Sequence, residues 1–121
     1  MREIGELINC GRARSVWQHA GHDSRVIKVQ HHFHAEDANR LEWLIWRNAP
    51  AGVRAWLVPC YQISDCGIYL VQHKGEPVTG RPDGYPEFFS DCKTENWVRI
   101  GNRVVMCDYA RRSIAEALGI C

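Results

Sequence analysis

The first third of the chain carries three short runs in which apolar residues alternate with polar ones or β-branched residues gather. Such runs are typical of β-strands. Gly11 ends the first run, and the Gly-His-Asp-Ser stretch at residues 21–24 is a turn signal between the second and the third. The pattern predicts strands over residues 4–10, 15–19 and 25–30.

The next stretch changes to a helical period. Its apolar positions recur every three or four residues, which predicts a helix with one buried face. Acidic residues near the start suit the helix dipole, and the Ala-Pro-Ala-Gly stretch at residues 49–52 ends the helix. The residues that carry this pattern are Glu36, Asp37, Ala38, Leu41, Leu44, Ile45 and Trp46.

The remaining pattern returns to strands. Strands are predicted over residues 55–64 and 68–72, with a turn at residues 65–67 between them. Glycine and proline punctuate residues 75–86, which predicts a loop and a boundary between two parts of the chain. A hairpin over residues 97–100 and 103–107, turning at 101–102, and a short helix over 111–118 close the chain.

This order of elements predicts one α+β domain over residues 1–121, with an antiparallel sheet, one helix packed on it, a hairpin and a short C-terminal helix. The chain has 121 residues, enough for one hydrophobic core. Its net charge of +1 gives no strong signal for nucleic acid, and no apolar run reaches membrane-spanning length. The first residues lack the apolar segment of a signal peptide, so we expect a cytoplasmic protein.

The chain contains six cysteines, an even number that would suit disulfides in a secreted protein. The expected cytoplasmic location and the adequate hydrophobic content favour free thiols instead. Cys107 lies in an apolar run and is expected to be a small core residue.

Candidate chemistry lies between the loop and the last helix. Asp91, Lys93 and Asn96 follow the spacing D-x-K-x-x-N, and Asp108 follows an apolar run further along. This set is typical of phosphoryl-transfer sites, where carboxylates, an amide and a cation hold the nucleophile, the metal and the phosphate. A polar loop before a hairpin, with Asp91 and Asn96 as turn formers, is the structural alternative.

With these residues the chain resembles the protein-kinase superfamily, in a truncated form similar to small kinase-like proteins encoded by bacteriophages. Residues 9–16 look like a glycine-rich loop that keeps only Gly11, and the Val-Ile-Lys-Val run at 26–29 looks like the strand of the nucleotide-binding lysine, Lys28. The resemblance makes Glu42 the partner of Lys28 and places Gln72 and His73 at the nucleotide hinge. The structural alternative is that Lys28 is an exposed strand lysine and Glu42 a solvated helix residue.

The resemblance also implies roles for the later residues. Asp91 would orient the accepting hydroxyl, Lys93 would face the γ-phosphate, and Asn96 and Asp108 would hold the metal of Mg-ATP. The segment Asp-Tyr-Ala at residues 108–110 looks like D-F-G without its last glycine. Residues 1–74 would then be a nucleotide lobe and residues 75–121 a vestigial second lobe.

The segments after the hinge are too short for the helices that bind a kinase's substrate. We therefore expect a pseudokinase-like protein of phage origin that binds and inhibits or redirects a host protein, for example as an anti-CRISPR type factor, with little or no catalysis. A genuine minimal Mg-ATP-dependent kinase and a structural interaction module without nucleotide binding are the alternatives.

Three further groups of residues have open interpretations. His31, His32 and His34 form a cluster, but zinc is not expected because no Cys-x-x-Cys pair accompanies them. Trp43 and Trp46 are expected to be core residues, with an outward protein-binding pair as the alternative. The basic residues Arg12, Arg14, Arg111 and Arg112 either contact phosphate or an acidic partner, or are ordinary surface residues.

Overall fold

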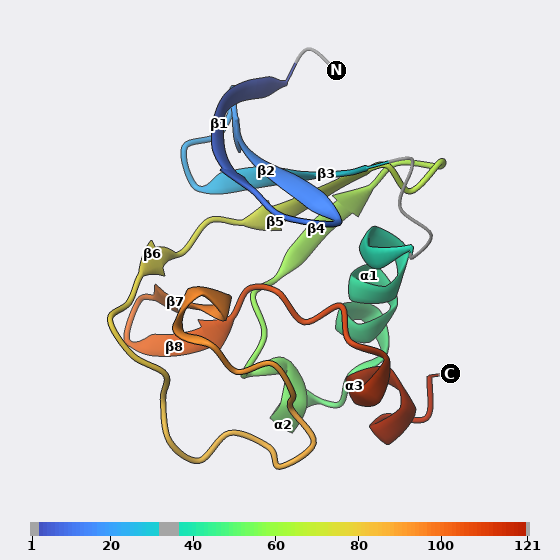
Figure 1. Ribbon diagram of the computed structural model, residues 1–121, viewed down its shortest axis with the longest axis vertical. Coiled ribbons are helices and arrows are strands. Elements are labelled where there is room, and N and C mark those ends of the chain that lie inside the picture. The colour runs from blue at the N-terminus through green and yellow to red at the C-terminus, as the bar shows by residue number, and fades with distance from the viewer. Residues whose placement is uncertain (1–2, 32–36, 121) are drawn as a thin grey trace.

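The computed structural model describes residues 3–31 and 37–120, and these form a large sheet above a smaller, helix-flanked part (Figure 1). The large sheet contains β1 (Ile4–Cys10), β2 (Arg14–His19), β3 (Arg25–Gln30), β4 (Cys60–Ile63) and β5 (Tyr69–His73). The smaller sheet contains β6 (Glu76–Pro77), β7 (Trp97–Ile100) and β8 (Arg103–Met106). The helices are α1 (Ala38–Asn48), α2 (Ala51–Arg54), the 3-10 turn η1 (Thr94–Asn96) and α3 (Arg112–Ala117).

The large sheet is antiparallel, with the strand order β1-β2-β3-β5-β4. Helix α1 packs against β3, β4 and β5 on one face of this sheet. This arrangement confirms the predicted α+β class, with an antiparallel sheet and one main helix. β2 pairs with β3 so that Val16 faces Lys28, and β3 pairs with β5 so that Lys28 faces Leu70. Lys28 therefore lies on the central strand, where the sequence alternates between the α1 face and the opposite face.

The hydrophobic core joins the two parts of the chain. Ile45 of α1 and Leu70 of β5 belong to the same buried cluster as Trp97, Met106 and Ile114 from the C-terminal part. All five side chains are at most 1% exposed. The segments 3–74 and 75–120 therefore share one core.

The predicted strand over residues 55–64 is wrong in its first half. Residues 51–54 form α2, and regular pairing with β5 begins only at Cys60. Trp56 and Val58 instead exchange backbone hydrogen bonds with Met106 of the smaller sheet, at 2.8 and 3.0 Å. The apolar run therefore bridges the two sheets, and Pro59, which lacks an N–H donor, separates it from β4.

The other predicted elements differ from the structure mainly at their ends. Asp37 caps α1 by accepting a hydrogen bond from the Arg40 N–H, while Glu36 lies outside the described residues. The predicted loop over residues 75–86 contains the two-residue strand β6, which pairs with β7. None of the helices within the described segments is long and apolar enough to cross a membrane.

Candidate binding cleft

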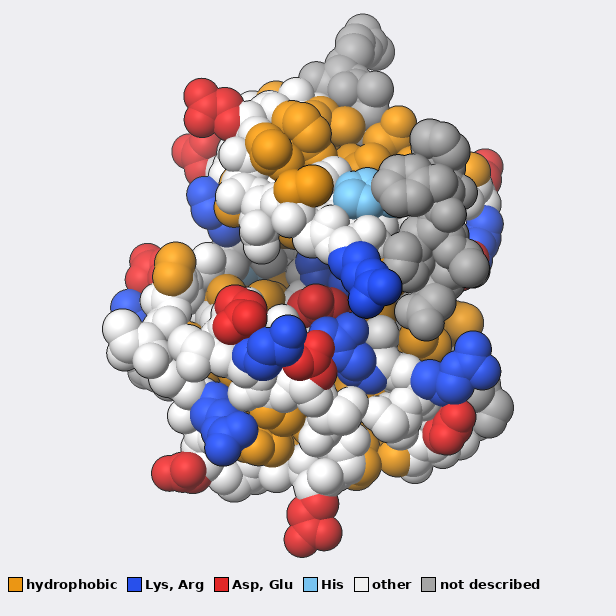
Figure 2. Space-filling view, viewed as in Figure 1, with side chains coloured by type: hydrophobic (Ala, Val, Ile, Leu, Met, Phe, Trp, Pro, Cys, Tyr) orange, Lys and Arg blue, Asp and Glu red, His pale blue; other side chains and the backbone are white. Residues whose placement is uncertain are grey.

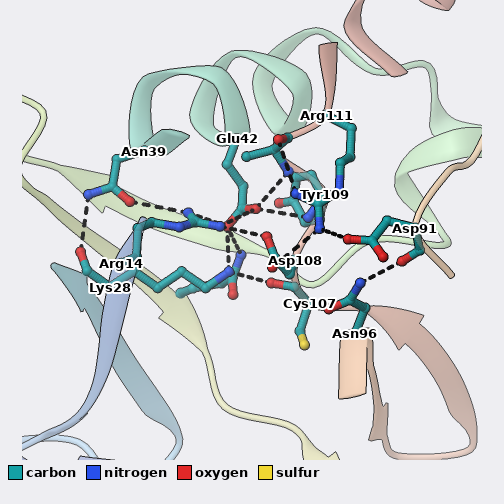
Figure 3. Close-up of polar contacts among 12 residues, drawn as sticks. Arg14, Lys28, Asn39, Glu42, Asp91, Asn96, Cys107, Asp108, Tyr109 and Arg111 are labelled. Carbon is teal, nitrogen blue, oxygen red and sulfur yellow. Dashed lines mark hydrogen bonds and ion pairs between the residues drawn. The ribbon is translucent and has the colours of Figure 1, made fainter. Parts of the chain in front are cut away.

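Glu42 is the centre of a buried polar cluster between α1, the large sheet and the segment after β8 (Figure 3). Its side chain is fully buried. Oε1 accepts hydrogen bonds from Arg14 Nη1, Lys28 Nζ and Gln72 Nε2 at 3.1, 2.5 and 3.1 Å. Oε2 accepts from Arg14 Nη2, Tyr109 N–H and Ala110 N–H at 3.2, 2.9 and 3.0 Å. A buried carboxylate with this many donors is fully satisfied.

The predicted pair of Lys28 and Glu42 is present in this cluster. Lys28 is 4% exposed, so its reading as a solvent-facing strand lysine is wrong. Its ammonium group also donates to the backbone carbonyl of Cys107. Lys28 therefore ties β3 both to α1 and to the segment that carries Asp108.

Arg14 is buried in the cluster, at 8% exposed, whereas the sequence favours a phosphate contact or a surface residue at this position. Its guanidinium group forms a two-pronged pair with Glu42 and donates to Asn39 Oδ1 at 3.2 Å. It also reaches Asp108 Oδ1 at 2.7 Å. Arg14 therefore neutralises both a buried carboxylate and a carboxylate predicted to hold metal.

The charges of this cluster stabilise one another. Burial raises the pKa of Glu42, but Arg14 and Lys28 outweigh burial and bring this pKa down to about 2. Burial lowers the pKa of Arg14, and its pairs with Glu42 and Asp108 reverse the shift and raise it. Glu42 and Arg14 are therefore both charged at neutral pH.

The residues predicted for catalysis and metal binding line one cleft next to this cluster. The cleft has a volume of about 630 Å³. Figure 2 shows acidic and basic side chains side by side across the middle of this face of the molecule. The lining residues are Arg12, Ala13, Asp91, Lys93, Asn96, Asp108 and Arg111.

Both carboxylates of the cleft already face cations. Asp91 pairs with Arg111 through Oδ2, and its Oδ1 lies 3.6 Å from Lys93 Nζ. Arg111 Nη2 also lies 3.6 Å from Asp108 Oδ2, while Arg14 holds Asp108 Oδ1. Arg111 therefore connects the two carboxylates across the cleft (Figure 3).

Asp91 has a left-handed backbone conformation, with φ of 55°. This region is sparsely populated by residues with a side chain. The Asn96 side chain donates to the Asp91 backbone carbonyl. The Asn96 backbone carbonyl accepts a hydrogen bond from Cys107 N–H at 2.8 Å. Asn96 is 6% exposed, so it holds the Asp91 loop against the start of the smaller sheet.

The residues predicted to contact the nucleotide do not gather at the cleft. Gly11 N–H closes a tight turn on the Arg14 carbonyl at 2.8 Å. Gln72 is 1% exposed and donates to Glu42 Oε1 within the buried cluster, and it does not line the cleft. His73 Nδ1 pairs with the Tyr61 hydroxyl at 2.7 Å. Only Arg12 and Ala13 of the predicted glycine-rich loop reach the cleft lining.

The donor set of the cleft does not fit the magnesium ion that the resemblance implies. Mg²⁺ needs carboxylate or carbonyl oxygens that are free to coordinate it. Asp108 uses one oxygen for Arg14 and turns the other toward Arg111, and the Asp91 oxygens face Arg111 and Lys93. Asn96 donates to the Asp91 carbonyl through its amide nitrogen, and its Oδ1 alone would not make a magnesium site. Among the described residues, no group of three or more His, Cys, Asp or Glu side chains is arranged to hold a metal ion.

The five cysteines of the described segments are free thiols, as expected. The sixth, Cys121, lies outside the described residues. Burial raises the pKa of Cys60 to about 11 and that of Cys107 to about 11. Cys60 packs beside the Tyr109 hydroxyl, 3.1 Å away, and Tyr109 donates to the Val58 carbonyl at 2.8 Å. These thiols are therefore protonated packing groups at neutral pH.

The remaining predicted groups lie away from the cleft. Of the histidine cluster, His31 bonds the Arg12 carbonyl, whereas His32 and His34 lie outside the described residues. Trp43 and Trp46 are partly buried against the core, and the guanidinium groups of Arg47 and Arg54 cover their rings. Both tryptophans therefore pack against the core, as expected.

Neither a scan against models of protein families nor a search of curated protein sequences finds a match for this chain. A functional conclusion therefore depends on the fold and the cleft.

Proposed function

We propose that this chain is a kinase-like protein that acts by binding and transfers little or no phosphate. The observation that carries the proposal is the pairing of both cleft carboxylates with arginine. Asp108 pairs with Arg14 at 2.7 Å, and Asp91 pairs with Arg111. A phosphoryl-transfer site needs one of these carboxylates for the metal and the other for the nucleophile.

Displacing the arginines would be costly. Arg14 is buried and shared with Glu42, so moving it away from Asp108 would also disturb the central cluster. Removing one partner of a buried ion pair costs roughly 3–5 kcal/mol, because the other charge is left uncompensated. The ion pairs therefore support a site that is held together for binding.

The proposed target is a host protein in the cytoplasm, which a phage-encoded protein of this kind would inhibit or redirect. Exposed apolar side chains on the described surface support a protein partner. Leu7 and Ile8, on the edge strand β1, are 51% and 48% exposed, and Leu44 on α1 is 45% exposed. Edge strands and exposed apolar residues are surfaces that another protein readily covers.

A minimal Mg-ATP-dependent kinase is the second candidate. The gathering of Asp91, Lys93, Asn96 and Asp108 along one cleft favours it, as does the pair of Lys28 and Glu42. The two candidates differ in what Asp91 does. In a kinase, Asp91 would be required for turnover, whereas in a binding protein it would only shape the cleft.

Phosphate transfer from radiolabelled Mg-ATP to water and to a general acceptor protein separates these candidates. We expect the purified wild-type protein and the Asp91→Asn variant to give the same background signal. Protein kinases turn over roughly 1–100 times per second. Transfer approaching that rate, and lost in Asp91→Asn, would contradict the proposed function and establish the kinase.

A further inference from the structure

We propose that the cleft binds a chain of phosphate groups directly through its arginine and lysine side chains, without a divalent cation. This inference rests on the proposed function, because a site that transferred phosphate would need the metal. In a metal site, Asp91 and Asp108 would coordinate the cation. In this cleft, the two carboxylates instead hold the arginine and lysine side chains in place for an anionic ligand.

Three cationic side chains line the cleft and are available to a ligand. Arg12 makes no ion pair with any described residue. The Lys93 side chain is 63% exposed, and its nearest carboxylate oxygen is 3.6 Å away. The Arg111 side chain is 27% exposed and holds Asp91 from the cleft wall. Arginine and lysine donate charge-assisted hydrogen bonds to phosphate oxygens.

Positive charge exceeds negative charge in and behind the cleft. Among the residues that the structure describes, three carboxylates face five cations, which leaves a surplus of two positive charges. The carboxylates are Glu42, Asp91 and Asp108, and the cations are Arg12, Arg14, Lys28, Lys93 and Arg111. Such a surplus attracts an anion and repels a further cation.

The cleft also has a suitable size. Its volume of about 630 Å³ lies within the roughly 300–1,000 Å³ typical of small-molecule sites. Arg12 on the turn before β2 and Lys93 before η1 approach the cleft from different segments. A phosphate chain that contacts both would therefore bridge the turn and the loop without displacing Arg14 from the buried cluster.

Isothermal titration calorimetry with tripolyphosphate tests this proposal on the full chain. We expect tripolyphosphate to bind in EDTA at least as tightly as in excess Mg²⁺, because the metal neutralises part of the ligand's charge. Added salt should weaken binding, as for any exposed charge contact. Binding that requires Mg²⁺ would overturn the proposal.

Two variants test whether the ligand binds in the cleft. The double variant Arg12→Ala, Lys93→Ala removes two donors that do not belong to the buried cluster. It should lose at least about tenfold in affinity, which corresponds to one charge-assisted hydrogen bond. Arg99→Ala is the matched control, because Arg99 is half-exposed on β7 and pairs with Glu76 instead. Equal binding by both variants would mean that tripolyphosphate binds outside the cleft, as an adventitious ion only, and would overturn the proposal.

Parallel titrations with inorganic phosphate and ATP identify the source of the phosphate groups. Equal affinities for ATP and tripolyphosphate would mean that the phosphate chain alone is recognised. Tighter binding of ATP in EDTA would mean that a nucleotide supplies it, and either result supports the proposal. Failure to bind any of these anions sinks this inference alone, whereas Asp91-dependent phosphate transfer contradicts the proposed function.

Discussion

At the scale of single residues, Glu42 determines how the polar interior is organised. A fully buried carboxylate is unfavourable unless donors surround it. Glu42 accepts six hydrogen bonds from the described residues, and two of its partners are the buried cations Arg14 and Lys28. Glu42 is the shared counter-charge of Arg14 and Lys28, and Arg14 has Asp108 as a second partner.

Glu42→Gln tests this dependence. The substitution keeps the size of the side chain but leaves Arg14 and Lys28 close together without their shared counter-charge. We expect a loss of roughly 3–5 kcal/mol in the free energy of unfolding, measured by urea denaturation. Glu76→Gln is the control, because the Glu76 side chain is 74% exposed in its pair with Arg99 and should change stability by less than about 1 kcal/mol. Similar small losses in both variants would contradict the structural role of Glu42.

At the scale of elements, the junction between the two sheets depends on close packing at Gly75. Gly75 lies between β5 and β6, where a Cβ atom would stand 2.6 Å from Val98 Cβ and 3.1 Å from the Arg99 carbonyl oxygen. Glycine therefore allows the chain leaving the large sheet to run directly against β7. The sequence pattern showed glycine here only as a loop former.

Gly75→Ala is expected to destabilise the protein by roughly 1–3 kcal/mol, because Val98 is on a paired strand and has little room to move. Gly80→Ala is the matched control in the same loop, since nothing lies within 4 Å of its added Cβ. That change should be neutral or stabilising by up to about 1 kcal/mol. Thermal unfolding of the two variants measures the difference, and equal melting temperatures would show that the junction tolerates a side chain.

The sequence predicted the elements with a clear period and missed those that depend on contacts between elements. Alternation and β-branched residues predicted β3 and the β7–β8 hairpin correctly, and the resemblance to protein kinases predicted the pair of Lys28 and Glu42. The strand prediction was wrong for the segment before Pro59, because the apolar residues of this segment bridge two sheets.

The burial of Arg14 was missed because it depends on strand register. Arg14 faces Gln30, and Val16 faces Lys28. Since alternate residues share a face, this register places Arg14 on the same face as Lys28. The spacing of the motifs does not give this register, so it could not place Arg14 beside Glu42.

At the scale of the whole molecule, the buried charges make stability depend on pH. The folded state lowers the pKa of Glu42 from an ordinary 4.5 to about 2, despite its burial, because Arg14 and Lys28 are adjacent. The unfolded chain therefore takes up this proton at a higher pH than the folded protein does. The stabilisation from Glu42 is fully present above about pH 4.5 and is lost as the pH falls toward 2.

Urea denaturation at several pH values between 7 and 2 checks this linkage. The wild-type protein should lose roughly 3 kcal/mol from Glu42 alone between pH 4.5 and 2, at about 1.4 kcal/mol for each unit of pKa shift. Glu42→Gln lacks this group and serves as the comparison, since other carboxylates titrate in both proteins. Parallel pH profiles of the two proteins would exclude the linkage.

The hydrogen bonds from Tyr109 N–H and Ala110 N–H to Glu42 have a consequence for amide hydrogen exchange. These two amides lie outside the helices and strands, in a segment where exchange with solvent is normally fast. Their acceptor is a buried carboxylate on α1, 67 and 68 positions away in the sequence. Both amides can therefore exchange only when the last segment of the chain separates from α1, so their protection factors report directly on the opening of the buried charge cluster.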